Sequence, residues 1–294
     1  MDFTTGAFLI TLVTALACAV PGIFIVLRQD SMLVDAIAHS VLPGIIIGYL
    51  FTADLQSPLL LIGAALAALL VVLATELLKK SGLLSTGTPI GLVFPALFSI
   101  GVMLLSTKFT NVHLDTHAVL VGDTNLAAFE QLEVFGLSLG PRYLYTVLSI
   151  FVLNLLFVWL LYPRLKVTTF DPAYAKSIGI KTGAVRWALM LSVAITVTGA
   201  FHSAGAILTP AMLIMPVAAG IMLVKKLTHM LLFTVGFAAL GSVTGFWSAY
   251  YLDQPTSPAV ALVFALLFTL SLIISKTGRR ANNSQRAAVS AAAS

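Results

Sequence analysis

Long apolar stretches separated by short polar segments occupy most of the sequence. Nine of them approach the length that a helix needs to cross the hydrocarbon core of a bilayer, about 20 mostly apolar residues. They run approximately over residues 6–27, 32–52, 58–78, 89–105, 143–162, 187–201, 204–224, 230–251 and 258–275. The sixth stretch is short and meets the seventh near Gly205, where we expect a tight turn or a broken helix. The pattern predicts an all-α fold, a polytopic transmembrane helical bundle of eight or nine spans.

The composition supports a membrane location. Hydrophobic residues make up 59% of the chain and charged residues 9%, with a mean hydropathy of +1.04, whereas soluble domains carry about 25% charged residues. The single cysteine, Cys18, excludes a disulfide or a multi-cysteine metal cluster within the chain. The basic residues fall between apolar stretches rather than on one soluble surface, so nucleic acid is not an expected partner. We expect residues 1–276 to form one transmembrane domain and the polar segment 277–294 to be a disordered cytoplasmic tail.

The distribution of charge predicts which way the bundle faces. Lys and Arg are concentrated in the cytoplasmic loops of membrane proteins. If the N-terminus lies outside and the chain crosses nine times, 14 of the 16 Lys and Arg residues fall inside, and only Lys108 and Arg142 fall outside. Seven of the 11 Asp and Glu residues fall outside, where they either attract cations or are ordinary solvated loop residues. The split predicts an outside N-terminus and a cytoplasmic C-terminus.

The second apolar stretch contains a pair of ionisable residues. Asp35 and His39 are four residues apart, so in a helix they share one face and lie about 6 Å apart along its axis. An ionisable residue inside a membrane helix is costly and indicates a functional site. A carboxylate oxygen and an imidazole nitrogen suit manganese, iron, zinc, cobalt or nickel better than potassium or calcium. Alternatively, these side chains pair with each other, or with Ser31 or Ser40, and stabilise helix packing.

Two residues that follow on the same helix extend this interpretation. Pro43 cannot donate a hydrogen bond to the His39 carbonyl, which is left for water, another side chain or an ion. Gly44 permits a neighbouring helix to approach closely. Because two side chains do not complete a coordination shell, we expect other helices, waters or a symmetry-related copy to contribute ligands.

A second group of candidate metal ligands lies in the outer loop. His113, Asp115 and His117 alternate along the sequence, so an extended segment would place them on one side. They could collect metal at the entrance of a transport path. An ordinary polar loop explains the same residues.

The largest inner loop predicts a short helix. Asp171 followed by Pro172 is typical of a helix start, with Asp as the N-cap and Pro at the first position. Gly179 is then expected to end the helix, and Ala175 and Ile178 share one of its faces. Such a helix either caps the bundle or docks into a groove on a soluble partner.

Several segments resemble the ABC-type permeases that import manganese, zinc or iron. The most specific are residues 22–28 (GIFIVLR) and 35–44 (DAIAHSVLPG), which are similar to the end of the family's first helix and to its second-helix signature. Further similar segments follow in the family's order, namely 118–123 (AVLVGD), 169–180 (TFDPAYAKSIGI) and 205–219 (GAILTPAMLIMPVAA). The resemblance covers nearly the whole chain up to about Lys276.

This resemblance implies a role for each part of the chain. Asp35 and His39 correspond to metal-contacting residues of the translocation path. The segment that couples to the ATPase comprises Phe170, Asp171, Pro172, Ala175, Ile178 and Gly179. The implied partners are a cytoplasmic ATP-binding subunit that carries the ATP, an extracytoplasmic metal-binding protein, and a second copy of the chain or a related permease. The implied location is a bacterial inner membrane, and the metal is cargo rather than a permanently bound cofactor.

The sequence also bears on two rival functions. It contains no Walker-type phosphate loop, nucleophile elbow or metalloprotease motif, so we expect a transport subunit rather than an enzyme. The rivals are a secondary metal transporter driven by an ion gradient and a membrane enzyme that uses Asp35 and His39 as an acid–base pair. A nucleotide-binding subunit that copurifies with the chain would favour the importer over both.

Overall fold

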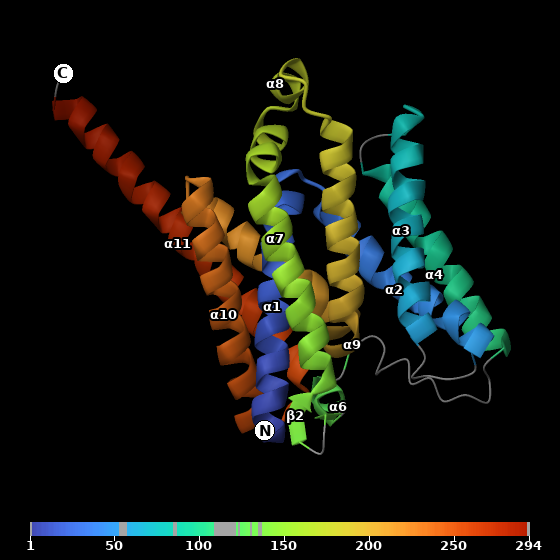
Figure 1. Cartoon of the computed structure of the whole chain (residues 1–294). Coiled ribbons are helices and arrows are strands. Elements are labelled where there is room, and N and C mark those ends of the chain that lie inside the picture. Colours follow the sequence, from blue (N-terminus) through green and yellow to red (C-terminus); the bar gives the residue numbers. More distant parts are fainter. Residues whose placement is uncertain are drawn as a thin grey trace.

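The computed structural model describes residues 2–52, 58–84, 87–108, 122, 124–129, 131–134 and 137–292, and these are almost all helical (Figure 1). The helices are α1 Phe3–Leu27, α2 Ser31–Thr52, α3 Pro58–Lys80, α4 Thr88–Lys108, α6 Thr124–Phe129, α7 Arg142–Phe170, α8 Pro172–Ser177, α9 Thr182–Leu223, α10 Leu227–Tyr251 and α11 Thr256–Ala292. A small antiparallel hairpin, which the sequence did not predict, pairs β1 Gln131–Val134 with β2 Leu137–Pro141. The predicted all-α membrane bundle is confirmed.

The apolar stretches of the sequence form the long helices. Among the described residues, seven helices are long and apolar enough to cross a membrane. The described apolar part of α4 is shorter, 88–104, and α9 joins the sixth and seventh predicted stretches in one element of 42 residues. Counting α4 and both arms of α9 gives the nine apolar segments that the sequence predicted.

The element α9 is a hairpin of two helical arms. Its backbone leaves the helical region at Gly205, with φ 70° and ψ −175°. Just before this break, the Ser203 carbonyl accepts a hydrogen bond from Ser257, at the start of α11. Near the end of α9, the Met222 carbonyl accepts one from Ser275, far along α11. The second arm therefore runs alongside α11, away from the break.

The first arm begins beside the end of α1, where Arg186 pairs with Asp30. The second arm returns toward that end, where Leu213 lies against Gly22 of α1, so the predicted interruption is a reversal of the chain.

The bundle has two distinct ends. The helices α1 and α7 run in the same direction, because Gly6 lies against Pro141 where they start and Arg28 bonds to Thr168 and Thr169 where they end. We call the end where α1 and α7 start the Gly205 end, and the end where they stop the α8 end. Figure 1 shows α8 projecting beyond the long helices.

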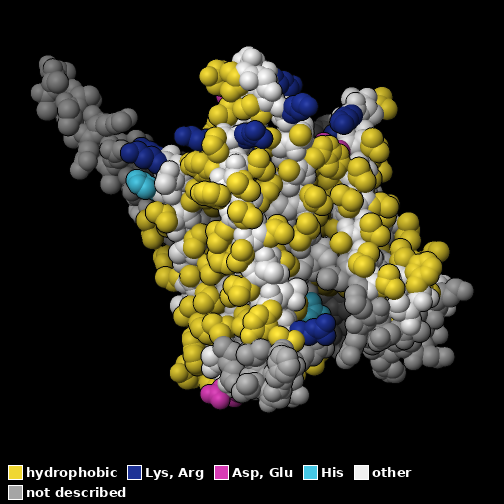
Figure 2. Space-filling view, viewed as in Figure 1, with side chains coloured by type: hydrophobic (Ala, Val, Ile, Leu, Met, Phe, Trp, Pro, Cys, Tyr) yellow, Lys and Arg dark blue, Asp and Glu magenta, His cyan; other side chains and the backbone are white. Residues whose placement is uncertain are grey.

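Burial separates a core from a surface suited to lipid. The helices α1 and α9 contribute most of the central cluster, including the fully buried Phe24, Ile25, Leu189 and Met190. Exposed Leu, Ile and Trp side chains cover the outer faces of α3, α7, α10 and α11. Figure 2 shows this apolar surface along the sides of the bundle, with Lys and Arg gathered toward the α8 end. This is the expected arrangement for a multi-pass membrane protein.

The helix α2 packs closely against its neighbours. A Cβ atom added at Gly44 would meet the Gly63 carbonyl and the backbone of Ala64 in α3, so the two helices approach at backbone distance. The close approach predicted at Gly44 is confirmed. On α4, Gly101 makes room for the Pro43 ring. These contacts position α2 between α3 and α4.

The last helix continues beyond the membrane-spanning part. We expected a disordered tail over residues 277–294, and α11 is helical as far as Ala292. Figure 1 shows this extension projecting away from the bundle. Its repeated alanines have the strongest intrinsic preference for helix of any residue. Residues 293–294 lie outside the described part.

Candidate functional site

The predicted pair on α2 lies on a partly open face of the chain. The Nε2 atom of His39 is 3.7 Å from Oδ1 of Asp35, with exposed side-chain fractions of 26% and 56%. This distance is too long for a hydrogen bond. Ser40, one of the alternative partners, donates its hydroxyl to the Ile37 carbonyl instead. The carboxylate and the imidazole are therefore close together without satisfying each other by a hydrogen bond.

Aromatic side chains of α4 fix the His39 ring. Its centroid lies 5.1 Å from that of Phe94 and 5.8 Å from that of Phe98, the latter edge to face. Its Nδ1 atom is buried and has no hydrogen-bond partner among the described residues. Packing rather than hydrogen bonding thus orients the imidazole, and its Nε2 atom faces Asp35.

This geometry is close to that of two ligands on one metal ion. Ligand nitrogen and oxygen atoms lie about 2.0–2.2 Å from zinc, so two ligands at tetrahedral or octahedral angles are about 3.0–3.5 Å apart. The observed 3.7 Å requires only a small side-chain movement. Within the described residues no group of three or more His, Cys, Asp and Glu side chains could hold a metal ion. Asp35 and His39 alone therefore give an incomplete site.

The other predicted metal group cannot be placed. His113, Asp115 and His117 lie outside the described residues, and their role as entrance ligands stays a prediction.

The short inner helix forms as its sequence predicted. The Asp171 carboxylate accepts a hydrogen bond of 2.9 Å from the Tyr174 backbone N–H, and Pro172 occupies the first turn. Gly179 follows the helix with φ 79°, a conformation that glycine adopts at low cost. Ala175 is fully buried, whereas Ile178, predicted on the same face, is half exposed.

Three apolar side chains of this region are exposed. Phe170, Tyr174 and Ile178 are all at least half exposed at the α8 end. We call residues 170–179 the coupling segment. Its structure is compatible with docking into a groove on another protein.

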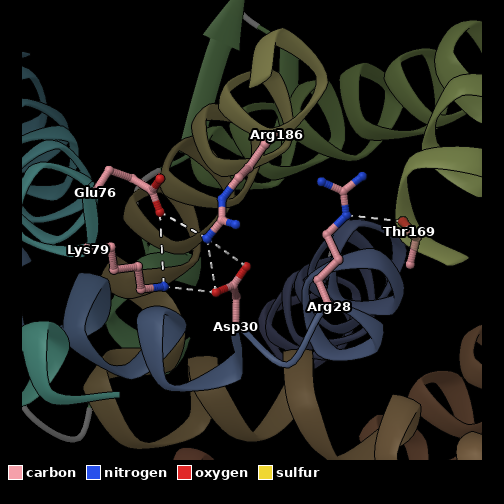
Figure 3. Close-up of polar contacts among 6 residues, drawn as sticks. All are labelled: Arg28, Asp30, Glu76, Lys79, Thr169 and Arg186. Carbon is pink, nitrogen blue, oxygen red and sulfur yellow. Dashed lines mark hydrogen bonds and ion pairs between the residues drawn. The ribbon is translucent and has the colours of Figure 1, made fainter. Parts of the chain in front are cut away.

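A network of charged residues, not predicted from the sequence, ties three elements together at the same end (Figure 3). Lys79 of α3 lies 3.1 Å from Asp30 in the turn before α2. Arg186 of α9 bridges Asp30 at 3.2 Å and Glu76 at 2.9 Å. The exposed fractions of the Asp30 and Glu76 side chains are only 9% and 11%. The signal in the sequence is that all four residues fall at inner ends of predicted spans, but it does not indicate which of them pair.

A model of the ABC 3 transport family matches residues 1–275. The chain belongs to the ABC 3 transport family. It is 40% identical to the zinc transport system membrane protein TroD of Treponema pallidum, over 92% of this chain and 74% of that protein. It is 34% identical to the manganese transport system membrane protein MntD of Bacillus subtilis, over 94% of this chain and 93% of that protein. Its fold is similar to PsaBC from Streptococcus pneumoniae in complex with Fab, with a TM-score of 0.77 and 25% identity over 92% of this chain and 91% of that one.

In this ABC 3 family member, two of the segments that carried the resemblance meet at the Gly205 end. A Cβ atom added at Gly122 would overlap the backbone of Ala204 and Gly205, so the outer loop touches the break in α9 directly. The Ser203 carbonyl beside the break accepts hydrogen bonds from Thr124 at 3.0 Å and from Ser257 at 3.3 Å. Hydroxyl donors of this kind satisfy backbone carbonyls near interruptions of membrane helices.

Arg186→Gln is expected to destabilise the protein by about 2–3 kcal/mol, because it leaves the low-exposure acids Asp30 and Glu76 with Lys79 as their remaining cation. This loss of stability is smaller than the loss expected for a fully buried ion pair, because the Arg186 side chain is 36% exposed. Thermal denaturation of the purified protein in detergent measures the loss. Arg164→Gln, at an exposed position of α7, is the matched control. Adding Asp30→Asn should recover part of the loss, and no recovery would contradict a shared network.

Proposed function

We propose that this chain is the membrane-spanning permease subunit of an ATP-driven importer of divalent transition-metal ions, namely manganese, zinc or iron. The observation that carries the proposal is a carboxylate 3.7 Å from an imidazole on a transmembrane helix of an ABC 3 family member. Ionisable residues at such positions indicate ion pathways. Relatives that are named for zinc and manganese transport support a metal as the cargo.

The exposed face of α2 supports a second copy of the chain, or a related permease, as a partner. Asp35 shares this face with the exposed Met32 and the partly buried His39, and further along α2 the side chains of Ile47 and Phe51 are exposed. Apolar side chains can face lipid, but a carboxylate there is costly. A partner that covers this face would exclude lipid from Asp35 and could supply the missing ligands. An incompletely coordinated ion is also easier to release, which a transport path requires.

The charge distribution supports the orientation of the subunit. The basic residues gathered toward the α8 end favour this end as cytoplasmic, with the N-terminus outside. An ATPase subunit would then dock on the coupling segment, and a metal-binding protein would deliver its ion at the Gly205 end. ATP binding and hydrolysis on the partner would move the coupling segment. The resulting change in helix packing would switch access to Asp35 and His39 from outside to inside.

Reconstitution tests this function. Vesicles that contain the chain and its ATPase subunit are expected to accumulate manganese, zinc or iron when a loaded binding protein is outside and ATP is inside. Accumulated metal is measured by mass spectrometry for each ion separately, which also identifies the cargo. An ATPase variant without its catalytic glutamate is the control. Uptake that follows an ion gradient without ATP would favour a secondary transporter, and conversion of a substrate without transport would favour an enzyme.

A further inference from the structure

A cleft of about 360 Å³ opens at the α8 end, beside the coupling segment. It lies between the end of α1, the end of α7, the helix α8 and the start of α9. Three of its lining residues are basic, namely Arg28, Lys176 and Arg186, and one is acidic, Asp30. Since Lys79 and Arg186 already pair with Asp30, the cleft has an excess of positive charge.

Arg28 is a partly buried basic residue of this cleft, and within the described part of the chain it has only neutral hydrogen-bond partners. Its Nη2 atom donates to the Thr168 hydroxyl at 2.7 Å. Its Nε atom donates to the Thr169 hydroxyl at 3.1 Å (Figure 3). These partners are neutral, and no ion pair joins Arg28 to a carboxylate among the described residues. Burial and the nearby charge of Arg186 lower the pKa of Arg28, and Asp30 opposes this only in part. A guanidinium ion has five N–H donors in a planar fork, so donors remain for an anion.

The surroundings of the cleft favour a protein as the source of that anion. Pro172 and Lys176, two of its lining residues, belong to the same short helix that exposes Tyr174. Phe170 and Ile178, on either side of this helix, are exposed as well. A soluble partner that covers these apolar side chains would also reach the mouth of the cleft. The group of the partner that would complement the positive charge of the cleft is a carboxylate, which can bind a guanidinium in a bidentate manner.

We propose that the ATPase subunit places an acidic side chain in this cleft, where its carboxylate pairs with Arg28 and Lys176. The proposal rests on the function proposed above and adds a specific electrostatic contact to it. The coupling segment would supply the apolar part of the interface and the cleft would supply the charged part. Because Arg28 directly follows α1 and lies two residues before Asp30, the contact would connect the ATPase to the charged network and to the start of α2.

Binding of the purified ATPase subunit to the full-length chain in nanodiscs tests the proposal. Arg28→Gln and Lys176→Glu are each expected to raise the dissociation constant about 10-fold or more, as for the loss of one charge-assisted contact. The affinity of the wild-type chain should fall with added salt, and that of the variants should fall less. Lys226→Glu, an exposed change before α10 and outside the cleft, is the matched control and should bind as wild type. Lys176 is itself exposed, so its variant is expected to remain folded.

The charge pair is then tested by reversal. Acidic residues of the ATPase subunit that face the coupling segment are changed to Lys one at a time, and one such change should restore binding to Lys176→Glu. Wild-type affinity in both cleft variants would overturn the proposal. An effect seen with phosphatidylglycerol but not with phosphatidylcholine nanodiscs would assign the cleft to an anionic lipid instead. If the wild-type chain did not bind the ATPase subunit at all, the proposed function itself would fail.

Discussion

Asp35→Ala and His39→Ala are each expected to reduce ATP-dependent metal uptake at least about 100-fold, since loss of even an outer-shell partner of a metal ligand costs about 10- to 100-fold. Each variant removes one of the two side chains that can face the ion along α2. The measurement is metal accumulated by reconstituted vesicles. Copurification with the ATPase subunit should be unchanged, because both side chains belong to α2 and neither is part of the coupling segment.

Two further variants separate metal binding from packing. Asp35→Asn keeps the shape of the side chain but removes its charge, so a ligand role predicts that uptake is lost with this variant as well. Met32→Ala changes an exposed apolar residue on the same face of α2 and is the matched control. Normal uptake in both alanine variants would exclude Asp35 and His39 from the transport path. Normal uptake in Asp35→Asn alone would indicate that Asp35 has a packing role.

Gly205→Ala is expected to lower the free energy of unfolding by about 1–3 kcal/mol, because a backbone with φ 70° and ψ −175° lies in a region that is essentially restricted to glycine. Gly205→Val should have a larger effect, since a β-branched residue tolerates a positive φ less well than alanine does. The loss is measured by thermal denaturation of the purified protein and by its yield in membranes.

A second glycine provides the control for this prediction. Gly236 lies within α10, and a Cβ atom added there would meet nothing within 4 Å. Gly236→Ala should therefore be neutral, or stabilising by up to about 1 kcal/mol through the higher helix propensity of alanine. If Gly205→Ala were as stable as Gly236→Ala, the reversal of α9 would not depend on the conformation of Gly205.

Some features of the fold and the site could be predicted from short segments of sequence. The spans follow from runs of apolar residues, because a helix in lipid satisfies its own backbone and needs only an apolar surface. The start of α8 follows from Asp171 and Pro172, whose effect is confined to one helical turn. The shared face of Asp35 and His39 follows from their spacing of four residues. The proposed metal contact of this pair remains a prediction.

Other features depend on residues that are far apart in the chain. Asp30 is 49 residues from Lys79 and 156 residues from Arg186 in the sequence, and it pairs with both. Many other pairings of these charged residues were compatible with the sequence. The position of the His39 ring depends on Phe94 and Phe98, which belong to another helix. The tail was expected to be disordered from its polar composition, and the helix α11 extends as far as Ala292.

The sequence by itself determined a multi-pass helical membrane protein, the short helix α8 and the candidate pair on α2, because each depends on periodicity or spacing within one segment. Only the tertiary structure decided that α9 reverses at Gly205, that Gly122 packs against this reversal, and that Arg28 lines a positively charged cleft beside α8. The physical reason is the way helices associate in a membrane. Apolar faces carry little information about which helices meet, so close backbone contacts and pairs of charges from distant segments select the arrangement.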